Sequence, residues 1–165
     1  MYQAIGIVEL KSIAKGIEAT DAALKSAGVK LVSAHPSCPG KYEIILTGGI
    51  ADVEAAVDHV KGRFDSRLID SCVIGRIDPQ VVTGMFGTQE GAKTGSVGII
   101  ETFSAASLIR AADIAVKNEK VAIYELRLSR GMGGKGLVII TGDVGDVTAS
   151  VGGGGGPAQG GGRCG

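Results

Sequence analysis

The chain has 165 residues, with 17 basic and 17 acidic side chains, 44% apolar residues and 4% aromatic residues. The balanced charge provides no field to gather nucleic acid or an acidic membrane surface, so neither partner is expected. The start of the chain lacks a signal-peptide pattern, and no apolar run approaches the roughly 18 residues of a membrane span. We therefore expect a soluble intracellular protein with an aliphatic core.

The first elements read as a strand followed by a helix. Residues 4–10 are rich in β-forming side chains, Ser12 suits a helix N-cap, and Gly28 stops the helical pattern. The helix is expected to cover one face of a sheet. The apolar positions that recur at helical spacing, and that we expect to face this sheet, are Ile13, Ile17, Leu24 and Ala27.

A hairpin and a second helix follow. Residues 29–35 and 42–47 predict two strands that flank the turn SCPG. The segment ADVEAAVDHVKG predicts a helix, and LIDSCVIGRI predicts a fourth strand. Residues 78–95 predict a short helical tail and then a polar, glycine-containing linker. The second helix is expected to bury one face, formed by Val53, Val57 and Val60.

The chain repeats itself at a spacing of about 92 residues. After the hairpin turn the spacing becomes about 94, because SCPGK in the first copy corresponds to the longer SRGMGGK in the second. This self-similarity predicts two copies of one unit. The matched pairs are Gly6 with Gly98, Glu9 with Glu101, Ser12 with Ser104, Asp21 with Asp113, and Lys25 with Lys117.

Each copy predicts the order βαββαβ, so the fold class is α+β, with two tandem ferredoxin-like domains. The expected boundaries are residues 1–88 for the first domain, 89–95 for a linker and 96–151 for the second domain. Residues 152–165 form a glycine-rich segment with no helical period, which predicts a disordered tail. A natural tail and a shortened gene product both fit this ending. Without a fourth strand, the second domain is expected to expose apolar sheet surface unless a partner chain covers it.

The sequence closely resembles the tandem-domain, trimer-forming shell proteins of bacterial microcompartments. The resemblance covers residues 2–151 and is nearest to the propanediol-utilisation type, which carries an iron–sulfur cluster at its pore. It is based on AIGIVELKSIAKGIEATDAALKSAGV, SCPGKY and TGGIADVEAAV in the first copy, and on VGIIET, AADIAVK, GMGGK and TGDVGDV in the second.

The resemblance implies a structural protein with no active site. Three chains would form a flat pseudo-hexagonal tile, and tiles would join edge to edge with other shell proteins around enclosed enzymes. It also implies that Lys25, Lys117 and Arg76, the last of these near Pro79, lie at the tile edge. The second copy lacks a counterpart of Arg76, which weakens the expectation that this chain forms the lattice.

The resemblance further implies that the first hairpin loop lines the central pore and that Cys38 ligates a [4Fe-4S] cluster shared by three chains. One cysteine per chain cannot hold a cluster, but a threefold axis brings three thiolates together. The fourth iron would then take water or a small ligand. The neighbouring pore-loop residues are Ser37, Pro39 and Gly40.

The second loop, RGMGGKG, invites comparison with a phosphate-binding loop, but the spacing of the Walker motif fails. A place at the channel rim is favoured, with Arg130 adding positive charge near the axis. The loop residues assigned to the pore are Arg130, Gly131, Met132, Gly133 and Gly134.

The remaining candidates favour structural roles. Cys72 alternates as a strand residue and is expected in the core, whereas Cys164 lies in the glycine-rich segment. His35 and His59 lack a second ligand at metal spacing. Glu9 and Glu101 occupy equivalent strands of separate copies, so hydrogen bonding is favoured over paired acid–base chemistry.

Three hypotheses follow. The first is a shell trimer whose pore cluster passes electrons across the shell or delivers clusters to an enclosed enzyme. The second is a metal-free shell trimer whose pore passes small polar metabolites. The third is a ferredoxin-like module that binds a small molecule between the copies. A cysteine-dependent enzyme is disfavoured, because no His/Asp constellation supports a nucleophile.

Overall fold

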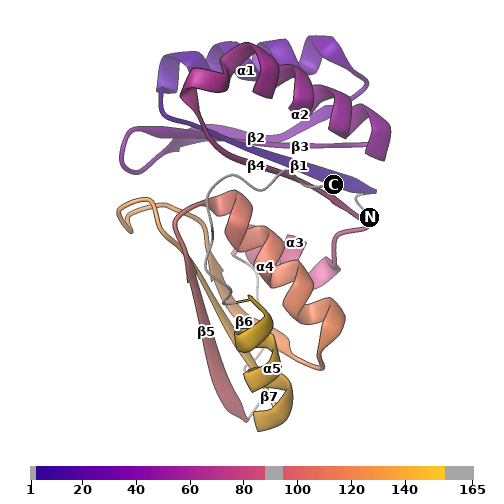
Figure 1. Ribbon diagram of the computed structural model, residues 1–165, viewed down its shortest axis with the longest axis vertical. Coiled ribbons are helices and arrows are strands. Elements are labelled where there is room, and N and C mark those ends of the chain that lie inside the picture. The colour runs from indigo at the N-terminus through magenta and orange to yellow at the C-terminus, as the bar shows by residue number, and fades with distance from the viewer. Residues whose placement is uncertain (1–2, 88–94, 155–165) are drawn as a thin grey trace.

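The computed structural model describes residues 3–87 and 95–154, which form two α+β domains (Figure 1). The order of elements confirms the predicted tandem ferredoxin-like fold. The first domain contains β1 (Ala4–Leu10), α1 (Ile13–Ser26), β2 (Lys30–Ser37), β3 (Lys41–Gly48), α2 (Ile50–Phe64), a 3-10 turn (Asp65–Arg67), β4 (Leu68–Gly75) and α3 (Pro79–Met85). The second contains β5 (Ser96–Thr102), α4 (Ala105–Asn118), β6 (Ala122–Arg127), β7 (Gly136–Gly142) and α5 (Val144–Gly154).

The first sheet is antiparallel, with the strand order β2-β3-β1-β4. Its central strand, β1, is buried along its whole length. Val8 and Leu10 belong to the core under α1 and α2, which we call the inner side of the sheet. Ile5 and Ile7 point to the opposite, outer face and belong to a core shared with the second domain. Both faces of this sheet are therefore covered.

Helix α1 is present as predicted, and Ser12 caps it by accepting a hydrogen bond from the backbone N–H of Lys15 at 3.3 Å. The predicted buried face, however, is wrong: Ile13, Ile17 and Leu24 are 41%, 57% and 38% exposed, and Ala27 is half-buried. Small residues face the sheet instead. Because their side chains are short, the helix packs close to the strands. The side that faces the sheet is formed by Gly16, Ala19, Thr20 and Ala23.

Helix α2 follows the sequence prediction more closely. Val53, Val57 and Val60 are all buried against the inner side of the first sheet. The tail after β4 is helical, as expected, and it crosses to the second domain. Its Gln80 side chain accepts a hydrogen bond from the N–H of Ile123 on β6 at 3.3 Å. The predicted linker, 89–95, lies almost entirely outside the described residues.

Helix α4 lies between the two sheets (Figure 1). One side meets the outer face of the first sheet, and the other meets the second sheet, whose strand order is β5-β7-β6. Leu108, Ile109 and Ala112 are consequently fully buried. The two domains share one continuous apolar core through this helix.

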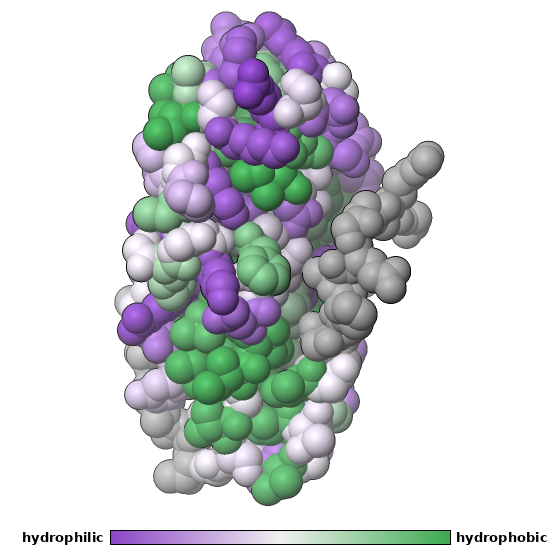
Figure 2. All heavy atoms as spheres, turned by 60° about the vertical axis from the view of Figure 1, so that its left-hand side comes forward, coloured by the Kyte–Doolittle hydropathy of each residue, from purple (hydrophilic) through white to green (hydrophobic). Residues whose placement is uncertain are grey.

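The outer face of the second sheet is open. Val97, Ile99 and Tyr124 on this sheet are 61%, 58% and 47% exposed, and Figure 2 shows a continuous hydrophobic area over this part of the molecule. Within the described residues, β5 pairs only with β7. The expected exposure of apolar sheet surface in the second domain is therefore confirmed.

Helix α5 lies on the inner side of the second sheet, where Val147 and Val151 meet Gly98. The helix ends at Gly154, so three residues that the sequence assigned to the tail are helical instead. The rest of the predicted tail, 155–165, lies outside the described residues.

Gly16 tests the close contact between α1 and the sheet. A Cβ at this position would lie 2.2 Å from the Tyr42 ring, so Gly16→Ala should lower the free energy of unfolding by about 1–3 kcal/mol through overpacking. Gly62 on α2 has open space around it, so Gly62→Ala should be neutral or stabilising by up to about 1 kcal/mol. Urea unfolding measures both. Equal effects of the two substitutions would contradict the tight α1 contact.

Candidate functional site: paired hairpin loops above a buried polar row

Cys38 lies at the tip of the β2–β3 hairpin, where its thiol is free and exposed. Gly40 completes the turn with φ of +72°, and a Cβ added to it would meet nothing within 4 Å. Ser37, the last residue of β2, is buried, and its hydroxyl donates to the carbonyl of Ser129 in the second domain at 3.2 Å. The thiol therefore projects from a loop whose base is fixed.

The corresponding loop of the second domain, residues 128–135, lies directly beside the first. Gly131, Gly133 and Gly134 all have positive φ, a conformation that favours glycine. Gly134 is packed so closely that a Cβ would lie 2.7 Å from the carbonyl oxygen of Cys38. Met132 is half-buried and Arg130 is exposed. The structure thus brings together the two loops that the sequence repeat makes equivalent.

Lys41 holds this pair of loops together. Its ammonium donates to the carbonyl of Gly134 at 3.2 Å and to the carbonyl of Phe103 at 3.0 Å. Both loops project from the same side of the molecule (Figure 1). Any assembly that turns this side inward would place the two loops around a common centre.

A row of polar side chains crosses the outer face of the first sheet below the loops. Register places His35, Glu43, Glu9 and Asp70 side by side on β2, β3, β1 and β4. Sequence reasoning missed Glu43 and its meeting with His35. The available signal was an acidic residue at a position that alternates with core residues in the strand KYEIILT.

This row binds the sheet to the start of α4. Glu9 Oε1 accepts a hydrogen bond from the N–H of Ala105 at 3.0 Å, which confirms the structural role predicted for Glu9. Asp70 Oδ2 accepts from the hydroxyl of Ser107 at 2.7 Å and from that of Ser104. Ser104 also caps the helix, because its Oγ accepts from the N–H of Ser107 at 3.0 Å. The row is therefore the polar part of the interdomain contact.

The charges in the row perturb one another. Burial raises the pKa of Glu9, and burial together with the nearby Glu9 charge raises the pKa of Glu43 to about 7. Burial and the positive charge of Arg130 lower the pKa of His35, whose Nε2 contacts the Arg130 guanidinium. Glu101, the counterpart of Glu9 on β5, is exposed and pairs with Lys135 at 2.8 Å.

The described residues of one chain do not group metal ligands. Among residues 3–87 and 95–154, no cluster of three or more His, Cys, Asp or Glu side chains could hold a metal ion. Cys72 lies in the core and its thiol donates to the carbonyl of Ala106 at 3.4 Å, as expected for a packing residue. His59 is exposed on α2, and Cys164 lies outside the described residues. Cys38 is the ligand candidate, and it needs partners from other chains.

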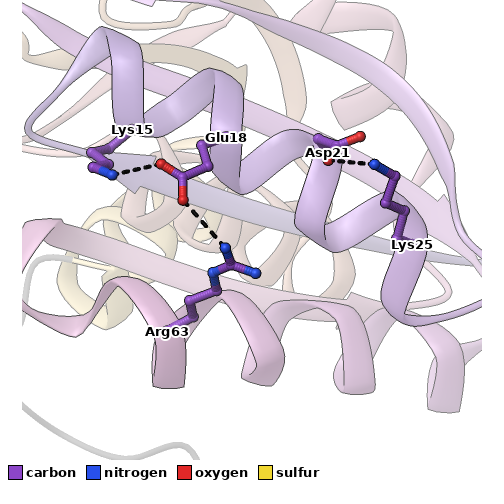
Figure 3. A network of polar contacts seen from close by, with 5 residues as sticks. All are labelled: Lys15, Glu18, Asp21, Lys25 and Arg63. Atoms are coloured by element: carbon purple, nitrogen blue, oxygen red, sulfur yellow. Dashed lines mark hydrogen bonds and ion pairs between the residues drawn. The ribbon is translucent and has the colours of Figure 1, made fainter.

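The residues predicted at a tile edge occupy equivalent places in the two domains. Lys25, in the last turn of α1, is exposed and pairs with Asp21 at 2.7 Å (Figure 3). Lys117, in the last turn of α4, pairs with Asp113 at 2.6 Å and is less exposed, because α4 lies against β4.

Arg76 follows β4 with φ of +50°, and its N–H donates to the Gln3 carbonyl at 2.7 Å. Its side chain is exposed. The edge role of these three residues stays a prediction. Glu18, which bridges Lys15 and Arg63 in Figure 3, ties α1 to α2.

The two repeats both match a known domain family. The model of the BMC domain matches residues 4–77 and 96–162. The chain is 42% identical over 151 residues to the bacterial microcompartment shell protein PduT of Citrobacter freundii, covering 92% of this chain and 82% of that protein. The chain belongs to the BMC-domain family of microcompartment shell proteins.

Solved structures agree with this assignment. A microcompartment protein from Desulfitobacterium hafniense has a TM-score of 0.78 and 44% identity, with 93% of this chain and 86% of that chain covered. A fused permuted hexameric shell protein of the RMM microcompartment has a TM-score of 0.69 at 23% identity, over 91% and 78% of the two chains, and so shares the fold. Within the described residues of this shell protein, no helix meets the length and hydropathy of a membrane span.

Asp70 tests the polar link between the domains. Asp70→Ala leaves two hydroxyls and the start of α4 without their charged acceptor, so it should lower the free energy of unfolding by about 1.5–3 kcal/mol. Asp58 pairs with Lys61 on the exposed surface of α2, and Asp58→Ala should cost under about 1 kcal/mol. Chemical denaturation compares them. A cost for Asp70→Ala no greater than that for Asp58→Ala would show that the row does not join the domains.

Proposed function

We propose that this shell protein forms a homotrimer with the outline of a hexagonal tile, whose centre is lined by the paired hairpin loops. The supporting observation is an interface between a helix and a sheet that is formed once within the chain. The two surfaces equivalent to this helix and this sheet are also both exposed elsewhere on the molecule. Inside the chain, α4 covers the outer face of the first sheet. The equivalent outer face of the second sheet is open.

The helix surface that could cover this open sheet face is exposed on α1. In the repeat, Ala105 and Ile109 of α4 correspond to Ile13 and Ile17 of α1. The α4 pair is fully buried between the sheets, whereas the α1 pair is exposed. The α1 stripe of one copy can therefore seat on the second sheet of another copy, as α4 seats on the first sheet. The apolar residues of these two surfaces are Ile13, Ile17 and Leu24 on α1, and Val97, Ile99 and Tyr124 on the second sheet.

This contact is heterologous, since each copy uses two different surfaces. Repetition of the relation between the two domains of one chain generates a ring, and three chains supply six domains. The ring places each first domain between two second domains. Burial of the stripe and the sheet face would contribute about 25 cal/mol for each Å² of apolar surface removed from water.

The trimer would bring the loops to its axis. Both loops lie on one side of the molecule, so three copies of Cys38 would alternate with three copies of Arg130. Three thiolates fit three of the four positions of a [4Fe-4S] cluster, and the exposed, free thiol of Cys38 suits this role. Such a cluster supplies one-electron chemistry. We infer that the pore serves electron transfer across the shell or delivery of the cluster.

A metal-free pore is the second candidate. Gly131 and Gly133 stand in open space, so the second loop exposes backbone polar groups, and Arg130 adds a cation. These features suit small polar metabolites. A ligand-binding module would instead need an enclosed cavity between the domains. The structure has a packed core there that includes Ile7, Leu108 and Ile109, and the hollow between β4 and α4 is open to the surface.

The proposed partners extend beyond the trimer. Lys25, Lys117 and Arg76 are candidates for contacts with other shell proteins at the tile edge, and enclosed enzymes are candidates for contacts with its faces. A structural role without catalysis fits the family, whose named relatives are shell proteins.

Substitution of either half of the interface should abolish the trimer. Ile17→Asp and Ile99→Asp each place a charge at a contact that excludes water, so both variants should elute as the 16.6 kDa chain. Val144→Asp is the control, because Val144 is 70% exposed on α5, which lies on the other side of the second sheet. Size-exclusion chromatography with in-line mass determination reads the outcome. Trimers that persist in both interface variants would refute the proposed seating of α1.

Iron content separates the two pore hypotheses. Protein purified and reconstituted without oxygen should be brown and bind about four iron atoms per trimer, and Cys38→Ser should lose the colour and the iron. Cys72→Ala is the control, since Cys72 lies in the core, and it should retain the iron. A colourless wild type would remove the cluster and leave the metal-free trimer standing.

A further inference from the structure

Glu9 and Glu43 form the least satisfied polar group in the described residues. Both side chains are fully buried, and they are directly paired across β1 and β3 on the outer face of the first sheet. Side chains paired in this way have Cβ atoms about 4.5–5.5 Å apart. Within the described part of the chain, Glu9 Oε2 and both carboxylate oxygens of Glu43 have no hydrogen-bond partner. Two adjacent carboxylates thus share a buried interface, where the N–H of Ala105 donates to Glu9 and the nearby Ser129 hydroxyl also favours the ionised form of Glu9.

No neighbouring cation neutralises this pair directly. From β2, the Nε2 of His35 lies 3.6 Å from Glu43 Oε1, but it also contacts the Arg130 guanidinium of the second loop. From β3, the Lys41 ammonium donates to two carbonyls rather than to a carboxylate. From β4, Asp70 adds a further negative charge, which accepts the hydroxyls of α4. Arg130 and Lys41 act on the pair only through their longer-range fields.

Two like charges in such a site cannot both ionise at neutral pH without a large cost. One proton removes that cost, because a protonated carboxyl is a donor as well as an acceptor and can bond to the facing oxygen. We propose that Glu9 and Glu43 together bind one proton, forming a proton-binding site at the interdomain contact, immediately below the hairpin loops. This site lies within one chain and does not depend on the proposed trimer or on a metal.

Loss of this proton would affect the contacts of both α4 and the second hairpin loop. The second negative charge would weaken the docking of the α4 start, where Glu9 accepts the N–H of Ala105. It would also place a full negative charge beside His35, whose Nε2 lies 3.6 Å from Glu43 Oε1 and contacts the Arg130 guanidinium of the second loop. The site therefore couples the proton concentration to the interdomain contact and to the loop that carries Arg130.

The direction of the pH effect follows from linkage. Burial and the Glu9 charge raise the pKa of Glu43 from an ordinary 4.5 to about 7 in the folded protein. The folded chain therefore binds more protons than the unfolded chain between these values, and its stability falls as the pH rises through the folded pKa. The melting temperature of the wild type should accordingly fall between about pH 5 and pH 8.

Infrared spectroscopy tests the site directly on the full-length protein. The wild type should show the C=O stretch of a protonated carboxyl at neutral pH, and this band should disappear as the pH rises past the pKa. Glu43→Gln should remove the band and flatten the fall in melting temperature. Glu101→Gln is the matched control, because Glu101 is the exposed counterpart of Glu9, and it should change neither.

Glu43→Leu serves as a second variant if the glutamine variant folds poorly, since Leu137 holds this position in the second domain. It too should abolish the band. Absence of the protonated-carboxyl band from the wild type at neutral pH would overturn the proposal, regardless of the spectra of the variants. A band that survives in both Glu43 variants would overturn it as well.

Discussion

The account depends on one contact, the seating of a helix on the outer face of a neighbouring domain's sheet. Within the chain, α4 makes this contact on the first sheet, and its other side packs against the second sheet. The contact leaves the first domain with both sheet faces covered and the second domain with one face open. The open apolar face and the exposed apolar stripe of α1 are the two surfaces of the heterologous contact that we propose between copies, which makes a ring where the rotation between neighbours closes.

The same contact explains why the polar row and the candidate pore residues lie where they do. The two hairpins project beyond the helix-to-sheet contact, so the loops with Cys38 and Arg130 lie beside each other and are joined through Lys41 and Ser37. Directly beneath them, the apolar core gives way to the row from His35 to Asp70, which receives the start of α4. Loop position, interdomain docking and the buried carboxylates therefore belong to one structural unit.

Much of this could be predicted from the sequence, because the repeat fixed the element order twice and the turns SCPG and RGMGGK marked the loops. The exposed face of α1 could not, because Ile13, Ile17 and Leu24 satisfy the pattern of a buried face whether the covering sheet belongs to the same domain or to another chain. The surroundings of Glu43 could not be predicted either. The register of the sheet places it beside Glu9 and His35, and the domain contact buries it, and no local sequence pattern encodes these features.

Electron cryomicroscopy of the purified protein tests the central claim most directly. The account predicts threefold particles in which α1 of each chain covers the second sheet of the next, with the Cys38 sulfur atoms around the axis. Stable monomers at high concentration, or particles with Cys38 at the outer rim, would contradict it.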